Sequence, residues 1–301
     1  MPLGYDKKIY IMAFDHRGSF IKLFGLSGTL TPEDTGRVAD AKMLIFEGLQ
    51  RAVAEGAPRE TAGVLVDEQF GAAVARKARA DGYPLAMPVE RSGQDEFDFE
   101  YGEDFGKHIE DFDPTFSKVL VRSNPDWAWE INERQFGRLK LLSDWLHERG
   151  RRFLYELLVP ATPEQLASVG GDAGRYDTEV RPKLMLRSIE EAQDFGIDPD
   201  IWKIEGIDSS ETCAEIAALV KRDGRDNVGC VVLGRGADDA AVEAWLRAGA
   251  KVPGYLGFAI GRSIFNESVK GVASGTMDRD TATAIISRKY RHFIDVYEGR
   301  A

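Results

Sequence analysis

Three ionisable residues stand inside short apolar runs of the sequence, where burying them is costly. Lys118 lies in SKVLVR, Glu156 in FLYELL and Lys203 in IWKIEG. Removing an ammonium or carboxylate group from water is unfavourable unless another group compensates it. A buried amine can form a Schiff base with a carbonyl compound, and a nearby carboxylate can then move protons on the intermediates. These residues are therefore our first candidates for chemistry.

Lys203 is the candidate nucleophile of this set. Burial in an apolar strand and a second cation such as Lys118 both favour the neutral amine, which attacks carbonyl carbon. Glu156, one strand earlier, is the candidate carboxylate that carries protons on and off the carbinolamine and the departing hydroxyl. Two structural alternatives remain. Lys203 could pair with Glu205 on the same strand face, and Glu156 could pair with a barrel lysine without reacting.

Other charged residues follow the ends of further apolar runs. Asp15 in FDHRGS can hold or deprotonate substrate hydroxyls, or it can cap a helix or pair with Arg17. VVLGRG and GFAIGRS each end in glycine and arginine, a pair that admits an anion close to backbone amides at a helix N-terminus. A turn glycine beside a solvated arginine is the alternative. The candidate substrate-binding and phosphate-binding residues are Arg17, Asp67, Glu90, Gly234, Arg235, Gly261 and Arg262.

A metal site is the main chemical competitor. Asp67, Glu90 and His16 are of types that ligate hard cations, but no H-x-H, H-x-E or carboxylate-rich spacing collects them. The chain has only four histidines and two cysteines. We therefore predict no metal and no other cofactor, and we expect Cys213 and Cys230 to be buried as small hydrophobes.

Eight β-rich runs could position these residues. They alternate with seven stretches of helical character, such as 37–56 and 132–150, whose apolar residues recur at spacings of three and four. Because parallel strands need helical crossovers, this alternation predicts an α/β fold, a (β/α)8 TIM barrel with parallel strands. A doubly wound open sheet is the alternative. In a barrel the chemistry lies at the carboxyl ends of the strands. The runs are 8–18, 61–71, 83–90, 117–126, 151–162, 201–206, 227–236 and 254–263.

Composition narrows the class of protein. No linker divides the 301 residues, so we expect residues 1–301 to form a single domain. A hydrophobic content of 43% and a charged content of 30% are typical of soluble proteins. No apolar run approaches the ~20 residues of a membrane helix, and a net charge of -11 predicts no nucleic-acid or membrane partner. The start lacks the cleavage site of a secretory signal, which favours a cytoplasmic location.

Two segments raise further expectations. The acidic and aromatic stretch 94–114 reads as a loop that covers one rim of the barrel. The amphipathic stretch 281–299 reads as a subunit interface or as the last barrel helix. A homo-oligomer is therefore left open.

The order of these segments also resembles a known family. The resemblance is to class I aldolases that include tagatose 1,6-bisphosphate aldolase and sulfofructose-phosphate aldolase. It is carried by AFDHRGSF, GVLVDEQFG, KVLVRSNPD, LYELLVP, IWKIEG and GFAIGRSIF. The chain most resembles the aldolase-like domain fused behind 5-dehydro-2-deoxygluconokinase in inositol catabolism. The similarity runs from about Ile9 to Tyr297.

This resemblance implies roles for individual residues. Lys203 is implied as the Schiff-base lysine, Glu156 as the proton-shuttling carboxylate and Lys118 as an assisting lysine of the fourth strand. Asp15 is implied as the aspartate of the first strand. The implied phosphate site consists of Arg262, Gly261, Ser263 and Gly234. The implied enzyme is a metal-independent aldehyde-lyase that cleaves 2-deoxy-5-keto-gluconate 6-phosphate to dihydroxyacetone phosphate and malonic semialdehyde.

The chain departs from the family pattern at three places. Gly206 stands where related segments commonly have proline after K-x-E, which predicts a different loop after the sixth strand. Arg122 replaces an aromatic residue and could take a substrate carboxylate or sulfonate, and Arg235 is an added cation. A tagatose bisphosphate or sulfofructose phosphate aldolase or transaldolase therefore stays open. So do a non-catalytic barrel that binds a sugar phosphate and regulates a partner, and a metal-dependent lyase or isomerase.

Overall fold

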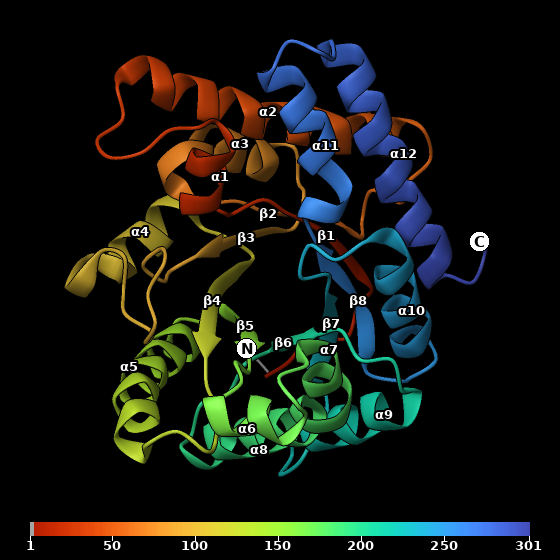
Figure 1. Cartoon of the computed structure of the whole chain (residues 1–301). Helices are drawn as coiled ribbons and strands as arrows, with labels where there is room; N and C mark the ends of the chain where they lie inside the picture. The colour runs from red at the N-terminus through yellow and green to blue at the C-terminus, as the bar shows by residue number, and fades with distance from the viewer. Residues whose placement is uncertain (1–2) are drawn as a thin grey trace.

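Eight parallel strands close into a barrel without an open edge. The computed structural model describes residues 3–301. The strands follow chain order around the ring, and the last pairs with the first. Figure 1 shows the strands around the centre and the helices outside them. The predicted TIM barrel is confirmed, and the doubly wound open sheet is wrong. The strands are β1 (Ile9–Ala13), β2 (Ala62–Leu65), β3 (Leu85–Pro88), β4 (Phe116–Arg122), β5 (Arg152–Leu158), β6 (Ile201–Glu205), β7 (Gly229–Leu233) and β8 (Tyr255–Ile260).

The helices begin mostly where a short polar side chain caps them. Thr31 accepts a hydrogen bond from the Asp34 amide in a capping box, with Pro32 in the first turn, so α2 begins five residues before the predicted stretch 37–56. The helical segments are α1 (Gly18–Leu23), α2 (Pro32–Ala54), α3 (Glu68–Ala80), η1 (Gly102–Asp104), α4 (Phe105–Phe112), α5 (Trp129–Glu148), α6 (Pro163–Ser168), α7 (Ala173–Arg175), η2 (Tyr176–Val180), α8 (Arg181–Asp194), α9 (Ser210–Leu219), α10 (Asp239–Ala250), α11 (Arg262–Ala273) and α12 (Arg279–Tyr297).

The barrel interior changes character along its axis. Alternate strand residues pack together apart from the main core and form an apolar plug, whose members are Ile9, Ile11, Ala13, Leu65, Ala86, Phe116, Leu154, Ile201, Val231, Leu256 and Ala259. Side chains alternate along a strand, so the next inward position after Phe116 is Lys118, after Leu154 it is Glu156, and after Ile201 it is Lys203. One strand pattern therefore builds an apolar plug with a charged layer directly above it.

The two segments expected at the rim and the C-terminus are both helical in part. The stretch 94–114 contains η1 and α4, because Phe97, Phe99 and Phe105 bury their rings against one another. The expectation of a loop over this whole stretch was therefore wrong. The stretch 281–299 forms most of α12, which packs on α2 and α11 and serves as the last helix of the barrel wall.

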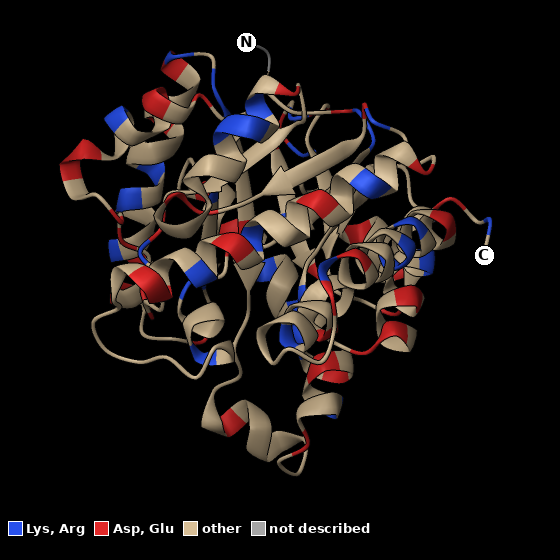
Figure 2. Ribbon diagram, turned by 90° about the horizontal axis from the view of Figure 1, so that it is seen from above, with Lys and Arg blue, Asp and Glu red and all other residues tan. Residues whose placement is uncertain are grey.

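The outer surface mixes both signs of charge. Figure 2 shows basic and acidic segments interleaved on the outer helices in that view, and many form ion pairs such as Arg279 with Glu47. Within residues 3–301, no helix combines the length and apolarity needed to cross a membrane. Cys213 and Cys230 are buried and unbonded, as expected.

Candidate active site

A cavity of about 850 Å³ opens at the carboxyl ends of the strands, above the apolar plug. Most predicted site residues line it. They are Asp15, Arg17, Glu90, Lys118, Arg122, Glu156, Lys203, Gly234, Arg235, Gly261 and Arg262. Two predicted residues, Asp67 and Ser263, lie outside its lining. The size suits a small-molecule ligand.

Lys203 and Glu156 are direct neighbours across the β5–β6 ladder. The register pairs the two residues, and Lys203 Nζ lies 3.0 Å from Glu156 Oε2. Their side chains are 3% and 7% exposed. The structural alternative in which Lys203 pairs with Glu205 is wrong, since Glu205 contacts Arg235 Nε at 3.1 Å and accepts the Val159 amide at 2.9 Å.

Lys118 is surrounded by carboxylates. Its Nζ lies 2.8 Å from Asp15, 2.8 Å from Glu90 and 3.0 Å from Glu156. An ammonium group has three donors, so each is matched by one acidic side chain. Burial opposes the charge, but the three carboxylates outweigh it and raise the pKa of Lys118 well above its ordinary value. Lys118 is therefore held as an ammonium ion.

The pKa values of the carboxyl groups around Lys118 are shifted in different directions. Burial raises the pKa of Asp15, yet Lys118 and neighbouring cations overcome it, and the net pKa is lowered. The pKa of Glu156 is also lowered, because Lys118 and Lys203 outweigh the effect of burial. Burial dominates at Glu90 and raises its pKa. Asp15 and Glu156 are thus set to be ionised.

The two lysines differ in a way that bears on reactivity. Among the side chains that the structure describes, Lys203 has one carboxylate partner, whereas Lys118 has three. The Lys203 amine faces the cavity with hydrogen-bonding positions that no other carboxylate takes. A carbonyl compound in the cavity can therefore reach Lys203, while Lys118 is committed to the ion cluster.

The anion site predicted after β7 and β8 centres on one arginine. Arg262 begins α11 and donates from Nη2 to the Arg235 carbonyl at 2.9 Å. Across residues 3–301 no carboxylate lies within ion-pair distance of Arg262, so its charge is available to a ligand. Arg235 differs, because Asp177 at 2.7 Å and Glu205 offset its charge.

Glycines let the backbone come close at this end of the cavity. A Cβ on Gly261 would lie 2.0 Å from the Ala13 carbonyl oxygen, so only glycine fits where α11 begins. Gly236 has φ of +73° and lies under the Arg262 guanidinium, where a Cβ would come within 2.8 Å of Nε. Gly236 was missed from the sequence, although the G-R-G pattern at 234–236 contains the signal.

Two other arginines line the cavity, Arg17 and Arg122. Arg17 donates to Glu100 at 2.8 Å and to the Glu90 carbonyl at 2.6 Å, which fixes the loop after β3. Arg122 donates to the Gln94 carbonyl at 2.7 Å, and no carboxylate of the described chain pairs with it. It thus offers a second available positive charge.

His16 lines the cavity beside Asp15. Burial lowers the pKa of His16 to about 4, with Asp15 opposing and Arg262 reinforcing this effect. Its ring is therefore neutral at physiological pH. Its buried Nδ1 has no hydrogen-bond partner within residues 3–301.

Asp67 and Ser263 have structural partners instead of a place at the cavity. Asp67 is fully buried, caps α3 by accepting the Phe70 amide at 2.9 Å, and pairs with Lys42. Lys42, to which no sequence motif pointed, also donates to the Phe14 carbonyl at 2.7 Å and so holds the end of β1. Ser263 donates to the Ala237 carbonyl at 2.8 Å.

The proposed metal ligands do not converge. Asp67 is bound to Lys42 and lies outside the cavity that Glu90 and His16 line, so the three do not meet around one cation. Over the described part of the chain, no group of three or more His, Cys, Asp or Glu side chains is arranged to hold a metal ion.

Close packing explains glycine at position 206. A Cβ on Gly206 would lie 1.9 Å from Cδ2 of Trp245, a residue of α10. The Gly206 carbonyl accepts a hydrogen bond from Arg181 at 3.0 Å. The departure from proline thus accommodates an indole ring, which fixes the loop after β6.

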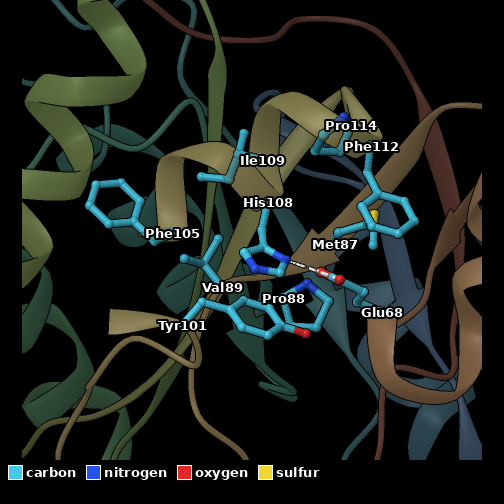
Figure 3. A pocket seen from close by; sticks show the side chains of 10 residues that line it. All are labelled: Glu68, Met87, Pro88, Val89, Tyr101, Phe105, His108, Ile109, Phe112 and Pro114. Carbon is cyan, nitrogen blue, oxygen red and sulfur yellow. Dashed lines mark hydrogen bonds and ion pairs between the residues drawn. The ribbon is translucent and has the colours of Figure 1, made fainter. Parts of the chain in front are cut away.

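A second hollow between β3 and α4 is far smaller. Figure 3 shows it lined by apolar side chains and by the His108–Glu68 pair, with the Tyr101 ring beside His108. Its volume of about 20 Å³ is close to that of one water molecule. The large cavity is therefore the candidate active site.

A family model matches nearly the whole chain. The model of the family described as "Uncharacterized protein conserved in bacteria (DUF2090)" matches residues 4–301. No curated protein matches the sequence.

Solved structures share the barrel at low sequence identity. A fructose-bisphosphate aldolase from Plasmodium falciparum has a TM-score of 0.62 and 14% identity, over 99% of this chain and 92% of that one. An archaeal fructose-1,6-bisphosphate aldolase, with its catalytic Lys covalently bound to the carbinolamine intermediate, has a TM-score of 0.57 and 15% identity, over 97% and 94%. Cgl0159 from Corynebacterium glutamicum has a TM-score of 0.57 and 18% identity, over 96% and 88%. The feature shared with these structures is the (β/α)8 barrel fold.

Proposed function

This chain belongs to the DUF2090 family, and from that premise and the geometry of its cavity we propose that it is a class I aldolase acting on a phosphorylated ketose or keto-sugar acid. The observation that carries the proposal is the Lys203–Glu156 contact of 3.0 Å, buried between an apolar plug and a large polar cavity. The archaeal structure similar to this chain holds a carbinolamine on its catalytic lysine, which supports the same chemistry.

The first half of the reaction uses Lys203 and Glu156. Lys203 Nζ adds to the substrate carbonyl carbon, and the proton lost from nitrogen passes to the new hydroxyl group. The hydroxyl needs a second proton to depart as water. The Glu156 carboxylate, 3.0 Å from Nζ, takes this proton from the Lys203 ammonium group when the amine is freed for attack, and returns it to the hydroxyl, which leaves an iminium ion. Lys118 holds Glu156 ionised between transfers.

The second half breaks a carbon–carbon bond. Asp15 takes the proton of the hydroxyl on the carbon that departs, that hydroxyl becomes an aldehyde carbonyl, and the bonding electrons pass to the iminium to give an enamine. Protonation of the enamine carbon and hydrolysis of the iminium release the ketone and restore the amine of Lys203. The reaction consumes no oxidant, and we propose that it needs no metal.

The available charges support a substrate with two anionic ends. Arg262 follows β8 and Arg122 ends β4, so they lie on opposite sides of the ring of eight strands. We propose that Arg262 and the α11 N-terminus bind a phosphate, and that Arg122 binds a carboxylate or a second anion. 2-Deoxy-5-keto-gluconate 6-phosphate has both groups. Tagatose bisphosphate and sulfofructose phosphate also have two anionic ends and are the next candidates.

Borohydride trapping tests the proposal. Wild-type protein is reduced in the presence of each candidate phosphate, and peptides are mapped by mass; the expected adduct lies on the peptide that contains Lys203. Lys203→Met should lose the adduct, whereas Lys251→Met, at an exposed lysine, should keep it. Cleavage is assayed with and without a chelator, and retention of activity is expected. A substrate that is cleaved without any adduct at Lys203 would refute the mechanism.

A further inference from the structure

Five buried side chains at the bottom of the cavity do not balance in charge. Three are acidic and two are basic, so with every group ionised they carry one net negative charge. Burying an uncompensated charge is costly, and one retained proton would make the cluster neutral. Arg17 leaves this balance unchanged because it pairs with Glu100. The five residues are Asp15, Glu90, Glu156, Lys118 and Lys203.

Glu90 is the acidic member with the least compensation. Its Oε1 accepts from Lys118 at 2.8 Å, while its buried Oε2 has no hydrogen-bond partner within residues 3–301. Glu156 contacts two ammonium groups, and its pKa is lowered; burial raises the pKa of Glu90. Two carboxyl groups whose environments shift their pKa values in opposite directions are suited to opposite roles, one as a neutral acid and one as a carboxylate.

We propose that Glu90 acts as a neutral carboxylic acid whose Oε2–H donates a hydrogen bond to a substrate oxygen, while Glu156 acts as a carboxylate. This inference rests on the proposed function. Glu90 and Asp15 both lie 2.8 Å from Lys118 Nζ, so a substrate hydroxyl beside Lys118 meets an acceptor and a donor together. Asp15 takes its proton, and Glu90 stabilises the oxygen that becomes the aldehyde carbonyl.

The same substitution at two sites separates these roles. In Glu90→Gln the amide oxygen still accepts from Lys118 and the amide N–H still donates to substrate, so kcat/KM at neutral pH should fall far less than it does in Glu90→Ala. Glu90→Ala removes the donor and should lose about 10²-fold. Glu156→Gln removes proton transfer and should lose about 10³-fold.

The pH profile gives a readout that a purely structural role would not change. The groups facing Glu90 are Asp15 and Arg17 after β1, Lys118 on β4 and Glu156 on β5. As the pH rises, ionisation of Glu90 removes the donor and adds charge beside Asp15, so wild-type kcat/KM should fall. Glu90→Gln cannot ionise and should lack this fall.

The assay measures kcat/KM from about pH 5 to 9 with the phosphate that gives the borohydride adduct. Glu103→Gln, an exposed change in the same inter-strand segment, is the control that should keep the wild-type profile. The adduct at Lys203 should form in both Glu90 variants, which verifies folding and the first half of the reaction. A kcat/KM of Glu90→Gln no higher than that of Glu90→Ala, or an unchanged alkaline fall of kcat/KM in Glu90→Gln, overturns the inference. Absence of the adduct in wild type refutes the proposed function instead.

Discussion

Replacing Lys118 and Lys203 separately by methionine distinguishes a structural cation from a reactive one. Lys118→Met leaves Asp15, Glu90 and Glu156 buried, and only Glu156 keeps an ammonium partner. Lys203→Met leaves Glu156 paired with Lys118 and removes an ammonium group whose side chain is 3% exposed. Both variants should lose the proposed aldolase activity, but we expect their stabilities to differ.

The magnitudes follow from the number of partners left behind. Removing one partner of a buried ion pair costs about 3–5 kcal/mol, so Lys118→Met should cost about 4 kcal/mol. The free energy of unfolding of Lys203→Met should range from about 1 kcal/mol below wild type to slightly above it, because a buried charge is removed. With 301 residues the unfolding entropy is about 0.63 kcal/mol/K, so about 4 kcal/mol lowers Tm by about 6 °C.

The loss of stability in Lys118→Met should depend on pH. The raised pKa of Lys118 means that its contribution to stability is present below its unfolded pKa of about 10.4 and is lost as pH rises through the folded value. The lowered pKa values of Asp15 and Glu156 mean that their contributions are present above about pH 4 and are lost as pH falls through the folded values. Without Lys118 these carboxyl groups take up protons at higher pH.

The difference in Tm between wild type and Lys118→Met, called the Tm gap below, should therefore decrease from pH 7 toward pH 5. Thermal melts followed by circular dichroism at both pH values, with urea unfolding as a second measure, test this expectation. Equal Tm changes in the two methionine variants would refute the assignment of Lys118 as the structural cation. A Tm gap that does not decrease between pH 7 and pH 5 would refute it too.

Two further predictions follow from the cavity and the loop after β6. Arg122→Ala should raise KM for a phosphorylated substrate with a carboxylate or sulfonate about tenfold more than for a ketose phosphate without that second anion. Arg262→Ala should raise KM for both substrates alike. Steady-state kinetics with the two substrates measures this, and an equal rise of both KM values in Arg122→Ala would contradict it. Gly206→Ala should destabilise the fold by about 1–3 kcal/mol through the clash with Trp245. Urea unfolding should show that adding Trp245→Leu to Gly206→Ala restores part of the lost stability. A free energy of unfolding for Gly206→Ala alone within about 0.5 kcal/mol of wild type would contradict the packing explanation.

Much of the barrel is readable from the sequence because its strands are simple. Apolar runs separated by helical stretches predicted all eight strands. Lys118, Glu156 and Lys203 were candidates because they are ionisable residues inside apolar runs, and all three line the cavity. The runs predicted from the sequence are longer than the strands, since they include the residues after each strand that line the cavity.

Pairing between charged residues was harder to predict. The local rule that residues two apart share a strand face suggested a Lys203–Glu205 pair, but the register between β5 and β6 matches Lys203 with Glu156. Register is a tertiary property, and one sequence does not display it. The charge on Arg235 is likewise offset by Asp177, a residue 58 positions earlier in η2.

Asp67 shows that local signals can be overlooked. It follows an apolar run and resembles a strand-end site residue, yet it is the N-cap of α3 and binds the Phe70 amide three residues later. An aspartate at this position before a helix is a typical cap, so the signal was present. Its partner Lys42 lies on α2, 25 residues away, and only the packed structure brings the two together.

The apolar plug under Lys203 also bears on the order of events in the cavity. Under the proposed function the plug closes the route past Ile201 and Phe116, so substrates and products share the mouth at the carboxyl ends of the strands. After bond cleavage the ketone fragment is still attached to Lys203 at the base, and the aldehyde lies nearer the mouth. The aldehyde therefore leaves first, and in the direction of synthesis the ketone must enter before it, which gives the enzyme ordered kinetics.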